Sequence, residues 1–381
     1  MEELQALRGE IDRIDAQLTD LFRRRMAVTR QVGEYKLAHG MKVLDAAREA
    51  EVLAKKTAQV EEELKADVTT LYESIMAISR RQQRRLVREE DRWFDGLRSD
   101  LHSARAPLAA PRVLYQGEEG AYAEQAAADF FGEDCARKHV PAWEDIFLAL
   151  RAGEADYGVL PIENSSTGSI NQVYDLLSKY GAYIVGEQTV RVSHCLLAPP
   201  GSTPDTLSQV YSHEQGLLQC EEYLKGRPGW STHAVANTAA AAKLVAESGD
   251  PAMAAIGSRR CAALYGLNVL AEGINSNAEN YTRFVVVAPV MELREGRDKI
   301  SALFTLSHQT GTLYRILTVF AAAGLNMMKL ESRPIPGRSW EYRFFVDFTG
   351  DLTADGMEGV LRELSQSSET FRVLGNYKAN G

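Results

Sequence analysis

Two polar stretches stand at the ends of apolar runs, where side chains are held firmly enough to take part in chemistry. Asn280-Tyr281-Thr282-Arg283 directly precedes 284–287, a Phe-Val-Val-Val run whose β-branched and aromatic residues predict a buried strand. The second stretch, 161–169, reads Pro-Ile-Glu-Asn-Ser-Ser-Thr-Gly-Ser. Each alone is typical of a satisfied strand end or a helix N-cap. Together, their hydroxyl, amide and charged groups indicate a site for a polar ligand.

A third set of polar residues interrupts an apolar stripe in the first hundred residues. Apolar residues recur at spacings of three and four from Leu4 to Tyr35, which predicts one long helix with a heptad seam. Arg25 occupies a seam position, where a charge is costly unless it is paired or meets a ligand. Two further helices, one beginning near residue 45 and one expected over 67–101, carry polar groups on their inner faces. These groups are Asp45, Arg48 and Glu49, which share one face by their spacing, and Ser79 and Gln83.

Together these side chains describe a cationic cavity that suits a small dicarboxylate. Its members are Arg8, Arg25, Lys36, Arg48, Ser79 and Gln83. At about 1.5 Å rise per residue, Arg8 lies roughly 25 Å from Arg25 along the helix, too far to share one small ligand. Arg8 must then reach the site of a second copy, so we expect an intertwined homodimer. The alternative is a coiled-coil arm in which these residues only set the register.

Residues 1–101 resemble the all-helical chorismate mutases at each of these positions. The resemblance implies rearrangement of chorismate to prephenate, a pericyclic step without a cofactor, driven by gripping both carboxylates and stabilising the breaking ether oxygen. Under this resemblance Lys36 and Gln83 are the donors to the ether oxygen. The carboxylate clamps are Arg25, Arg48 and Arg8 of the partner chain, and Asp45, Glu49 and Ser79 complete the substrate-binding set.

After a Pro-containing linker at 102–111, the periodicity changes to short strands alternating with helices. Strands are expected at 113–115, 157–160, 183–185, 210–211 and 254–256, and helices at 121–131, 170–179 and 238–247. This alternation predicts an α/β domain over 112–290 with mainly parallel sheets. In such sheets ligands bind at strand-to-helix turns, which here carry 163–169, 212–215 and 237–238.

The amino-acid sequences of these turns resemble those of the prephenate dehydratases. The matching segments are Pro161-Ile162-Glu163-Asn164-Ser165, Tyr211-Ser212-His213, Gln219-Cys220, 266–270 and Thr282-Arg283-Phe284, whereas 116–122 departs from the pattern. The family fold is two periplasmic-binding-protein-like lobes, and the crossovers would fall near 189–198 and 281–288. The implied reaction converts prephenate to phenylpyruvate with loss of water and carbon dioxide.

The same resemblance assigns roles around the leaving hydroxyl. Thr282 is the implied donor, with a hydrogen-bonded relay or a Glu163 kept protonated by burial as alternatives. Asn164, Ser212 and Gln219 are implied positioning donors. Arg283 either neutralises a substrate carboxylate or is structural.

The last domain, 298–378, has the predicted order β-α-β-β-α-β, a ferredoxin-like α+β arrangement. It resembles an ACT regulatory domain, which implies feedback inhibition by L-phenylalanine. The effector-binding residues implied are Gly311, Thr312, Leu313, Glu331, Ser332 and Arg333, although Thr312 and Tyr314 depart from the usual motif. The whole chain therefore resembles the bifunctional chorismate mutase/prephenate dehydratases of phenylalanine biosynthesis.

The composition of the chain excludes several functional classes of protein. With 43 Lys and Arg against 52 Asp and Glu, the net charge of −9 argues against a non-specific nucleic-acid binder. Four widely spaced cysteines, the absence of an 18-residue apolar run and the polar N-terminus predict a cytoplasmic chain with reduced thiols, no metal and no membrane partner. Two alternatives stay open: a two-lobed solute sensor that binds without turnover, and an active dehydratase whose helical domain is only regulatory.

Overall fold

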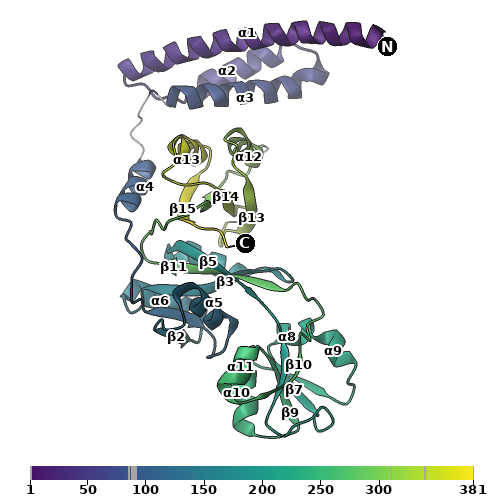
Figure 1. Cartoon of the computed structure of the whole chain (residues 1–381). Coiled ribbons are helices and arrows are strands. Elements are labelled where there is room, and N and C mark those ends of the chain that lie inside the picture. The colour runs from purple at the N-terminus through teal and green to yellow at the C-terminus, as the bar shows by residue number, and fades with distance from the viewer. Residues whose placement is uncertain (1, 85, 87–91, 310, 339, 381) are drawn as a thin grey trace. The chain divides into compact units, whose positions relative to one another are not determined.

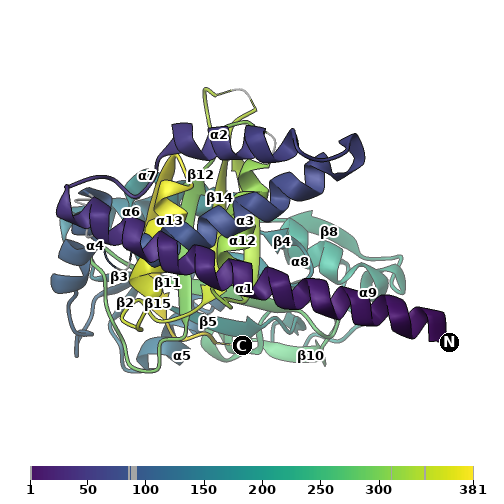
Figure 2. The same cartoon turned by 90° about the horizontal axis from the view of Figure 1, so that it is seen from above.

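The computed structural model of the chain describes residues 2–84, 86, 92–309, 311–338 and 340–380. The helical part consists of α1 (Glu2–Ala38), α2 (Ala46–Thr57), a short 3-10 turn (Glu62–Leu64) and α3 (Lys65–Arg84). Helix α3 packs against both α1 and α2, and the N-terminal part of α1 projects beyond them (Figure 2). The predicted long first helix is confirmed.

The single helix predicted over 67–101 is interrupted at Leu86, and the prediction for residues 85 and 87–91 lies outside the described residues. Helix α3 ends at Arg84, Leu86 lies in a turn, and a separate helix α4 (Arg92–His102) follows.

The first α/β lobe is built on a six-stranded sheet with the order β2-β1-β3-β11-β5, and β4 pairs with β3 (Figure 1). Its strands are β1 (Val113–Gln116), β2 (Arg137–Val140), β3 (Tyr157–Asn164), β4 (Gly168–Ser169), β5 (Tyr183–Arg191) and β11 (Tyr281–Ala288). Its helices are α5 (Tyr122–Phe131), α6 (Trp143–Ala152) and α7 (Asn171–Tyr180). The apolar run of β11 is buried between two strands, as its composition predicts.

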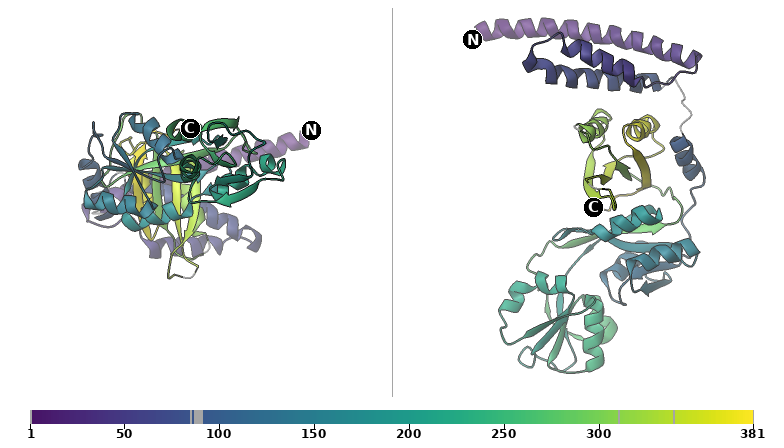
Figure 3. Two further views of the ribbon diagram at one scale, coloured as in Figure 1. Left: turned by 90° about the horizontal axis from the view of Figure 1, so that it is seen from below. Right: turned by 180° about the vertical axis from the view of Figure 1, so that it is seen from behind.

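The second lobe is the teal and green part of the chain in Figure 3. It has a five-stranded sheet of order β10-β6-β9-β7-β8. Its strands are β6 (Cys195–Ala198), β7 (Gln209–Ser212), β8 (Ser231–Ala234), β9 (Met253–Gly257) and β10 (Asn268–Glu272). Its helices are α8 (Glu214–Gln219), α9 (Glu221–Lys225), α10 (Thr238–Ser248) and α11 (Arg259–Tyr265). The expectation of mainly parallel sheets needs correction, because β11 and β5 in one lobe and β6 and β10 in the other pair antiparallel. All four strands adjoin the two crossings between the lobes. Of these, β11 and β6 run against the strands of the β-α-β units, whereas β5 and β10 run in the same direction as those strands.

The chain crosses between the lobes at 192–194 and again at 273–280. The second crossing therefore ends where the predicted one began. The two crossing segments are hydrogen-bonded to each other: Val192 N donates to Asn280 O at 2.7 Å, His194 N to Asn275 Oδ1 at 2.9 Å, and Ile274 N to His194 O at 3.0 Å. These hydrogen bonds hold the two crossing segments side by side, next to the polar stretch 280–283.

The last domain has the predicted element order, with a four-stranded antiparallel sheet of order β13-β14-β12-β15. Its elements are β12 (Lys299–Thr305), α12 (Thr312–Ala322), β13 (Met327–Pro334), β14 (Tyr342–Thr349), α13 (Met357–Gln366) and β15 (Thr370–Tyr377). The sheet packs on the first lobe through a shared apolar core that includes Tyr174 and Phe345. Gly375 contacts the backbone of Ile184 so closely that a Cβ there would overlap it.

The segment predicted as a linker, 102–111, has no helix or strand beyond the end of α4 but is anchored to the first lobe. Arg105 Nε donates to the fully buried Glu292 at 3.0 Å, and Leu108 N donates to Tyr157 Oη at 3.2 Å. Among the helices of the described residues, none is long and apolar enough to cross a membrane.

Candidate active sites

The helical part brings Arg25 into contact with one of the predicted polar groups, Ser79. Arg25 Nη1 donates to Ser79 Oγ at 2.5 Å. Gln83, one turn further along α3, is buried against Gly33, and its Oε1 has no hydrogen-bond partner among the described side chains. Within the described part of the chain no carboxylate pairs with Arg25, so its charge is available to an anion.

Lys36 and Arg48 have different surroundings. Lys36, half-buried near the end of α1, donates from Nζ to the carbonyl of Val43 at 2.5 Å. Arg48 is exposed on α2 and pairs with Glu51, with Nη1 and Oε2 2.6 Å apart. A substrate carboxylate would therefore have to displace Glu51 to reach the Arg48 guanidinium.

Asp45 and Glu49 serve helix α2 in two ways. Asp45 is the N-cap, because its carboxylate accepts from Arg48 N at 3.0 Å, so the prediction that it lies on the helical face of Arg48 and Glu49 needs correction. The Glu49 carboxylate accepts from Arg80 Nη1 at 2.6 and 2.7 Å. Sequence reasoning missed Arg80, because nothing in the sequence tells which of the adjacent half-buried Arg80 and Arg81 pairs with Glu49.

Arg8 lies on the same continuous helix as Arg25 and is exposed. Around it α1 leaves a row of large apolar side chains half exposed or more, namely Leu4, Leu7, Ile11, Ile14, Leu18 and Leu21. A stripe of that length on a soluble helix is typical of an interaction face.

In the first α/β lobe, Asn164 and Thr282 are paired across β3 and β11. Asn164 Nδ2 lies 2.9 Å from Thr282 Oγ1 and 2.7 Å from Asn280 Oδ1. Asn164 Oδ1 accepts from the backbone N–H groups of Ser166 and Thr167 at 2.9 and 3.1 Å, which identifies Nδ2 as the donor. The two polar stretches singled out in the sequence are thus in direct contact.

Gln219, at the end of α8, reaches the crossing segments through His194. His194 Nε2 lies 2.9 Å from Gln219 Oε1, and Ser276 N donates to the Gln219 carbonyl at 2.8 Å. His194 is 2% exposed, and its burial holds its pKa below the usual range, so the ring is neutral and Nε2–H donates to Gln219. The Gln219 amide nitrogen has no hydrogen-bond partner among the described residues, so it can donate to a ligand.

Ser212 does not fit its predicted role as a positioning donor. Its side chain is fully buried and its hydroxyl donates to the carbonyl of Ile256 at 2.8 Å, which ties β7 to β9. The Ser212 side chain therefore supports the second lobe and offers no hydrogen to a ligand.

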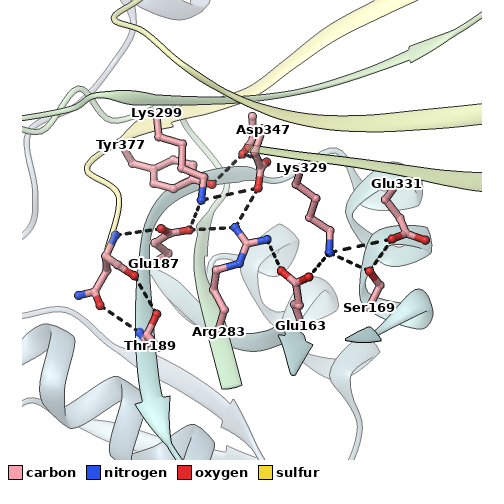
Figure 4. Close-up of polar contacts among 12 residues, drawn as sticks. Glu163, Ser169, Glu187, Thr189, Arg283, Lys299, Lys329, Glu331, Asp347 and Tyr377 are labelled. Carbon is pink, nitrogen blue, oxygen red and sulfur yellow. Dashed lines mark hydrogen bonds and ion pairs between the residues drawn. The ribbon is translucent and has the colours of Figure 1, made fainter. Parts of the chain in front are cut away.

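Glu163 and Arg283 point away from Thr282, because successive residues of a strand face opposite sides of the sheet. Their side chains meet at 2.9 Å (Figure 4). Partial burial alone would raise the pKa of Glu163, but the Lys329 hydrogen bond and the Arg283 charge hold it below the usual range. The predicted alternative of a protonated Glu163 acid is therefore corrected. So is the assignment of Arg283 to a substrate carboxylate, because its partners are carboxylates of the chain itself.

These two residues belong to a layer of charges between the first lobe and the four-stranded sheet, which we call the ionic layer (Figure 4). Arg283 Nη1 pairs with Asp347 at 2.8 Å and Glu187 at 3.1 Å. Lys299 Nζ pairs with Glu187 at 2.8 Å, and both of these side chains are almost fully buried. Lys329 Nζ pairs with Glu163 at 2.6 Å. Nothing in the sequence indicated this layer, since its members lie on six different strands.

The predicted effector motif is divided between the two faces of β13. Glu331 bonds Ser169 Oγ at 2.5 Å and Arg333 pairs with Asp175 at 2.7 Å, so both charged side chains are occupied by the first lobe. Their assignment to a free ligand is corrected accordingly. Ser332 is exposed on the other face. Gly311, with φ +81°, precedes Thr312 and Leu313 at the start of α12.

All four cysteines are free thiols, as their spacing predicts. Among the described residues, no group of three His, Cys, Asp or Glu side chains is arranged to hold a metal ion.

Two protein families match this chain, one over its helical part and one over its two-lobed part. The family described as "Chorismate mutase type II" matches residues 7–84, and "Prephenate dehydratase" matches residues 113–292. The bifunctional chorismate mutase/prephenate dehydratase of Escherichia coli K12 is 35% identical over 98% of this chain and 96% of its own length.

Two solved structures are each 30% identical with a TM-score of 0.65. One is prephenate dehydratase from Arthrobacter aurescens in complex with L-Phe, which covers 70% of this chain and 90% of its own. The other, GqqA, is described as a novel type of quorum quenching acylase; the match covers 71% of this chain and 98% of GqqA. Because the relative from E. coli matches almost the full length of both chains, the protein belongs to the bifunctional chorismate mutase/prephenate dehydratase family.

Proposed function

We propose that this chain converts chorismate to prephenate in its helical part and prephenate to phenylpyruvate in its two-lobed part, and that L-phenylalanine inhibits the second step. The observation that carries the proposal is the contact of Asn164 with Thr282, because it places a polarised hydroxyl within the segment that matches prephenate dehydratase. The Arg25 charge, which pairs with no carboxylate in the described part of the chain, carries the corresponding argument for the mutase.

The mutase step needs only binding and orientation. Arg25 and the partner's Arg8 hold the two carboxylates of chorismate in the compact conformer, which removes most of the entropic barrier. Lys36 Nζ and the amide of Gln83 donate to the ether oxygen as its C–O bond breaks. Asp45, Arg48, Glu49 and Ser79 complete the pocket. The exposed apolar row on α1 supports pairing with a second copy, which supplies that Arg8.

The dehydratase step breaks two bonds of prephenate. The ring carboxylate leaves as carbon dioxide, its bonding electrons enter the ring, and the hydroxyl on the opposite ring carbon departs with one added proton as water. Thr282 donates its hydrogen bond to that hydroxyl and passes on a proton that solvent replaces. Gln219 orients the remaining carboxylate through its free amide nitrogen.

We assign the feedback inhibition of the dehydratase step to L-phenylalanine bound at the C-terminal domain, which contains the four-stranded sheet. Its strand order is that of an ACT domain, and the similar dehydratase from A. aurescens was solved with L-Phe. The ligand's carboxylate suits the backbone around Gly311–Leu313, at the start of α12, and Ser332 supplies a hydroxyl. The effector acts only if it binds one arrangement of the ionic layer better than another.

A coupled assay tests these assignments on the full chain. Chorismate should yield phenylpyruvate without added cofactor, and L-phenylalanine should suppress that product while prephenate accumulates. Thr282→Ala should stop at prephenate. Thr206→Ala, which removes a hydroxyl that bonds backbone groups of Thr203 and Pro251, should behave as wild type. Ser332→Ala should weaken the inhibition.

Two results would contradict the proposal. Binding of prephenate without turnover would favour the solute-sensor alternative. Inhibition by phenylalanine that is strictly competitive with prephenate, and unchanged in Ser332→Ala, would remove the C-terminal sheet as its receptor.

A further inference from the structure

The Thr282 hydroxyl has a fixed hydrogen-bond direction. Both hydrogens of Asn164 Nδ2 point toward the triplet of Asn280 Oδ1, Tyr281 O and Thr282 Oγ1, at 2.7, 3.1 and 2.9 Å. Because Thr282 Oγ1 accepts from this amide, its own hydrogen must be donated elsewhere. No acceptor for it is found among the described residues, so the hydrogen is available to a ligand.

Asn280 determines whether Asn164 can hold that arrangement. Asn280 Oδ1 makes the shortest of the three contacts and accepts one of the two amide hydrogens of Asn164 Nδ2. The other amide hydrogen is then left for Thr282 Oγ1. The Asn280 side chain is 1% exposed, and its carbonyl oxygen anchors the crossing through Val192 N. Its Nδ2 has no partner in the described structure, and an unmet buried donor costs about 1–3 kcal/mol. Groups left unmet in this way are concentrated at functional sites.

We propose that Asn280 is a positioning residue for the dehydratase reaction: it locks the Asn164 amide so that Thr282 accepts from Asn164 and directs its own hydrogen at the leaving hydroxyl of the substrate. Asn280 acts through Asn164 and touches no reacting atom. This inference rests on the proposed role of Thr282 as the hydroxyl donor.

A double-mutant cycle on the full chain, with prephenate as substrate and the uncatalysed rate subtracted, tests the proposal. Asn280→Ala should lower kcat by about 10- to 100-fold with little change in KM, since a small misplacement of a reacting group has effects of that size. In a Thr282→Ala background the same change should lower kcat less than about threefold, because the group being positioned is already absent.

Two further variants separate positioning from folding. Asn280→Asp keeps an oxygen for Asn164 Nδ2 and should recover part of the lost kcat. Asn277→Ala removes another asparagine of the same crossing, whose amide contacts Ser166 and Glu279, and should leave kcat near wild type.

The outcomes distinguish this inference from the assignment beneath it. Full dehydratase activity in Thr282→Ala would overturn the role of Thr282 and with it the inference. If Thr282→Ala is inactive but the two losses multiply in the double variant, or if Asn280→Asp is as impaired as Asn280→Ala, only the role of Asn280 is overturned.

Discussion

Replacing Lys299 by methionine should loosen the contact between the first lobe and the four-stranded sheet. Lys299 is 3% exposed, and its Nζ lies 2.8 Å from Glu187 Oε2 and 3.6 Å from Asp347 Oδ2. Methionine keeps the length of the side chain but removes its charge. Glu187, 4% exposed, then depends on Arg283 Nη1 at 3.1 Å and on the backbone N–H of Asn380 at 2.9 Å.

The size of the effect follows from burial. Removing one partner of a buried ion pair costs about 3–5 kcal/mol, and the two remaining donors to Glu187 place this case near 3 kcal/mol. At about 1.4 kcal/mol per factor of ten, local opening becomes roughly 100-fold more frequent. Adding Glu187→Gln removes the buried carboxylate that has lost its Lys299 partner. The double variant should therefore be more stable than Lys299→Met alone.

Amide hydrogen exchange read by mass spectrometry measures this opening strand by strand. Peptides covering β5 and β12 should exchange roughly 100-fold faster in Lys299→Met, whereas β7 in the second lobe should not change. Lys329→Met is the matched control: its partner Glu163 is 36% exposed at the side chain, so water replaces the lost cation and the effect should stay below about 1 kcal/mol. The reasoning fails if Lys299→Met exchanges like wild type, or if the double variant opens more readily than the single one.

Three other predictions concern assembly, packing and acid. Co-refolding equal amounts of Arg8→Ala and Lys36→Ala chains should restore about a quarter of the wild-type mutase activity, because half of the dimers would be mixed and each would hold one intact site; proven mixed dimers without activity would exclude a shared site. Gly375→Ala should lower the melting temperature of the dehydratase part, since the added Cβ meets the Ile184 backbone, and an unchanged melting curve would contradict that contact. Burial alone would raise the pKa of Asp347, but Arg283, Lys299 and the Ser301 hydroxyl hold it below its usual range; its contribution to stability is therefore present above about pH 4 and lost as the pH falls further, so Asp347→Asn should flatten the loss of stability in urea titrations below that pH.

Much of the secondary structure could be predicted from the sequence, because it depends on local patterns of apolar and polar residues. The apolar run 284–287 could only be a buried strand, and its polar prefix had to lie at the end of that strand. The stripe from Leu4 to Tyr35 likewise had to be one helix. What no local pattern contains is the register: that Thr282 pairs with Asn164 follows from the way β11 returns beside β3 after more than a hundred residues.

The residues that were misassigned share a physical cause. Arg283 stands next to Thr282 in the sequence, and proximity suggested a common ligand, whereas strand alternation sends the two side chains to opposite faces. The same alternation turns Glu331 and Arg333 toward the first lobe and leaves Ser332 exposed. Arg80 was missed, and Asn280 was singled out only as part of its polar stretch, because their partners, Glu49 and Asn164, come from other elements.

That alternation also joins the catalytic and regulatory proposals. Asn164 and Thr282 face the proposed dehydratase site. Glu163 and Arg283, their immediate neighbours and themselves paired in register, face the ionic layer. A tenfold inhibition requires a coupling free energy of only about 1.4 kcal/mol. A single buried pair of the layer, such as Lys299 with Glu187, is worth more than that when one partner is lost. An effector that displaces the four-stranded sheet enough to lengthen one such pair would therefore have sufficient energy to shift β3 and β11, and with them the hydrogen bond on which Thr282 depends.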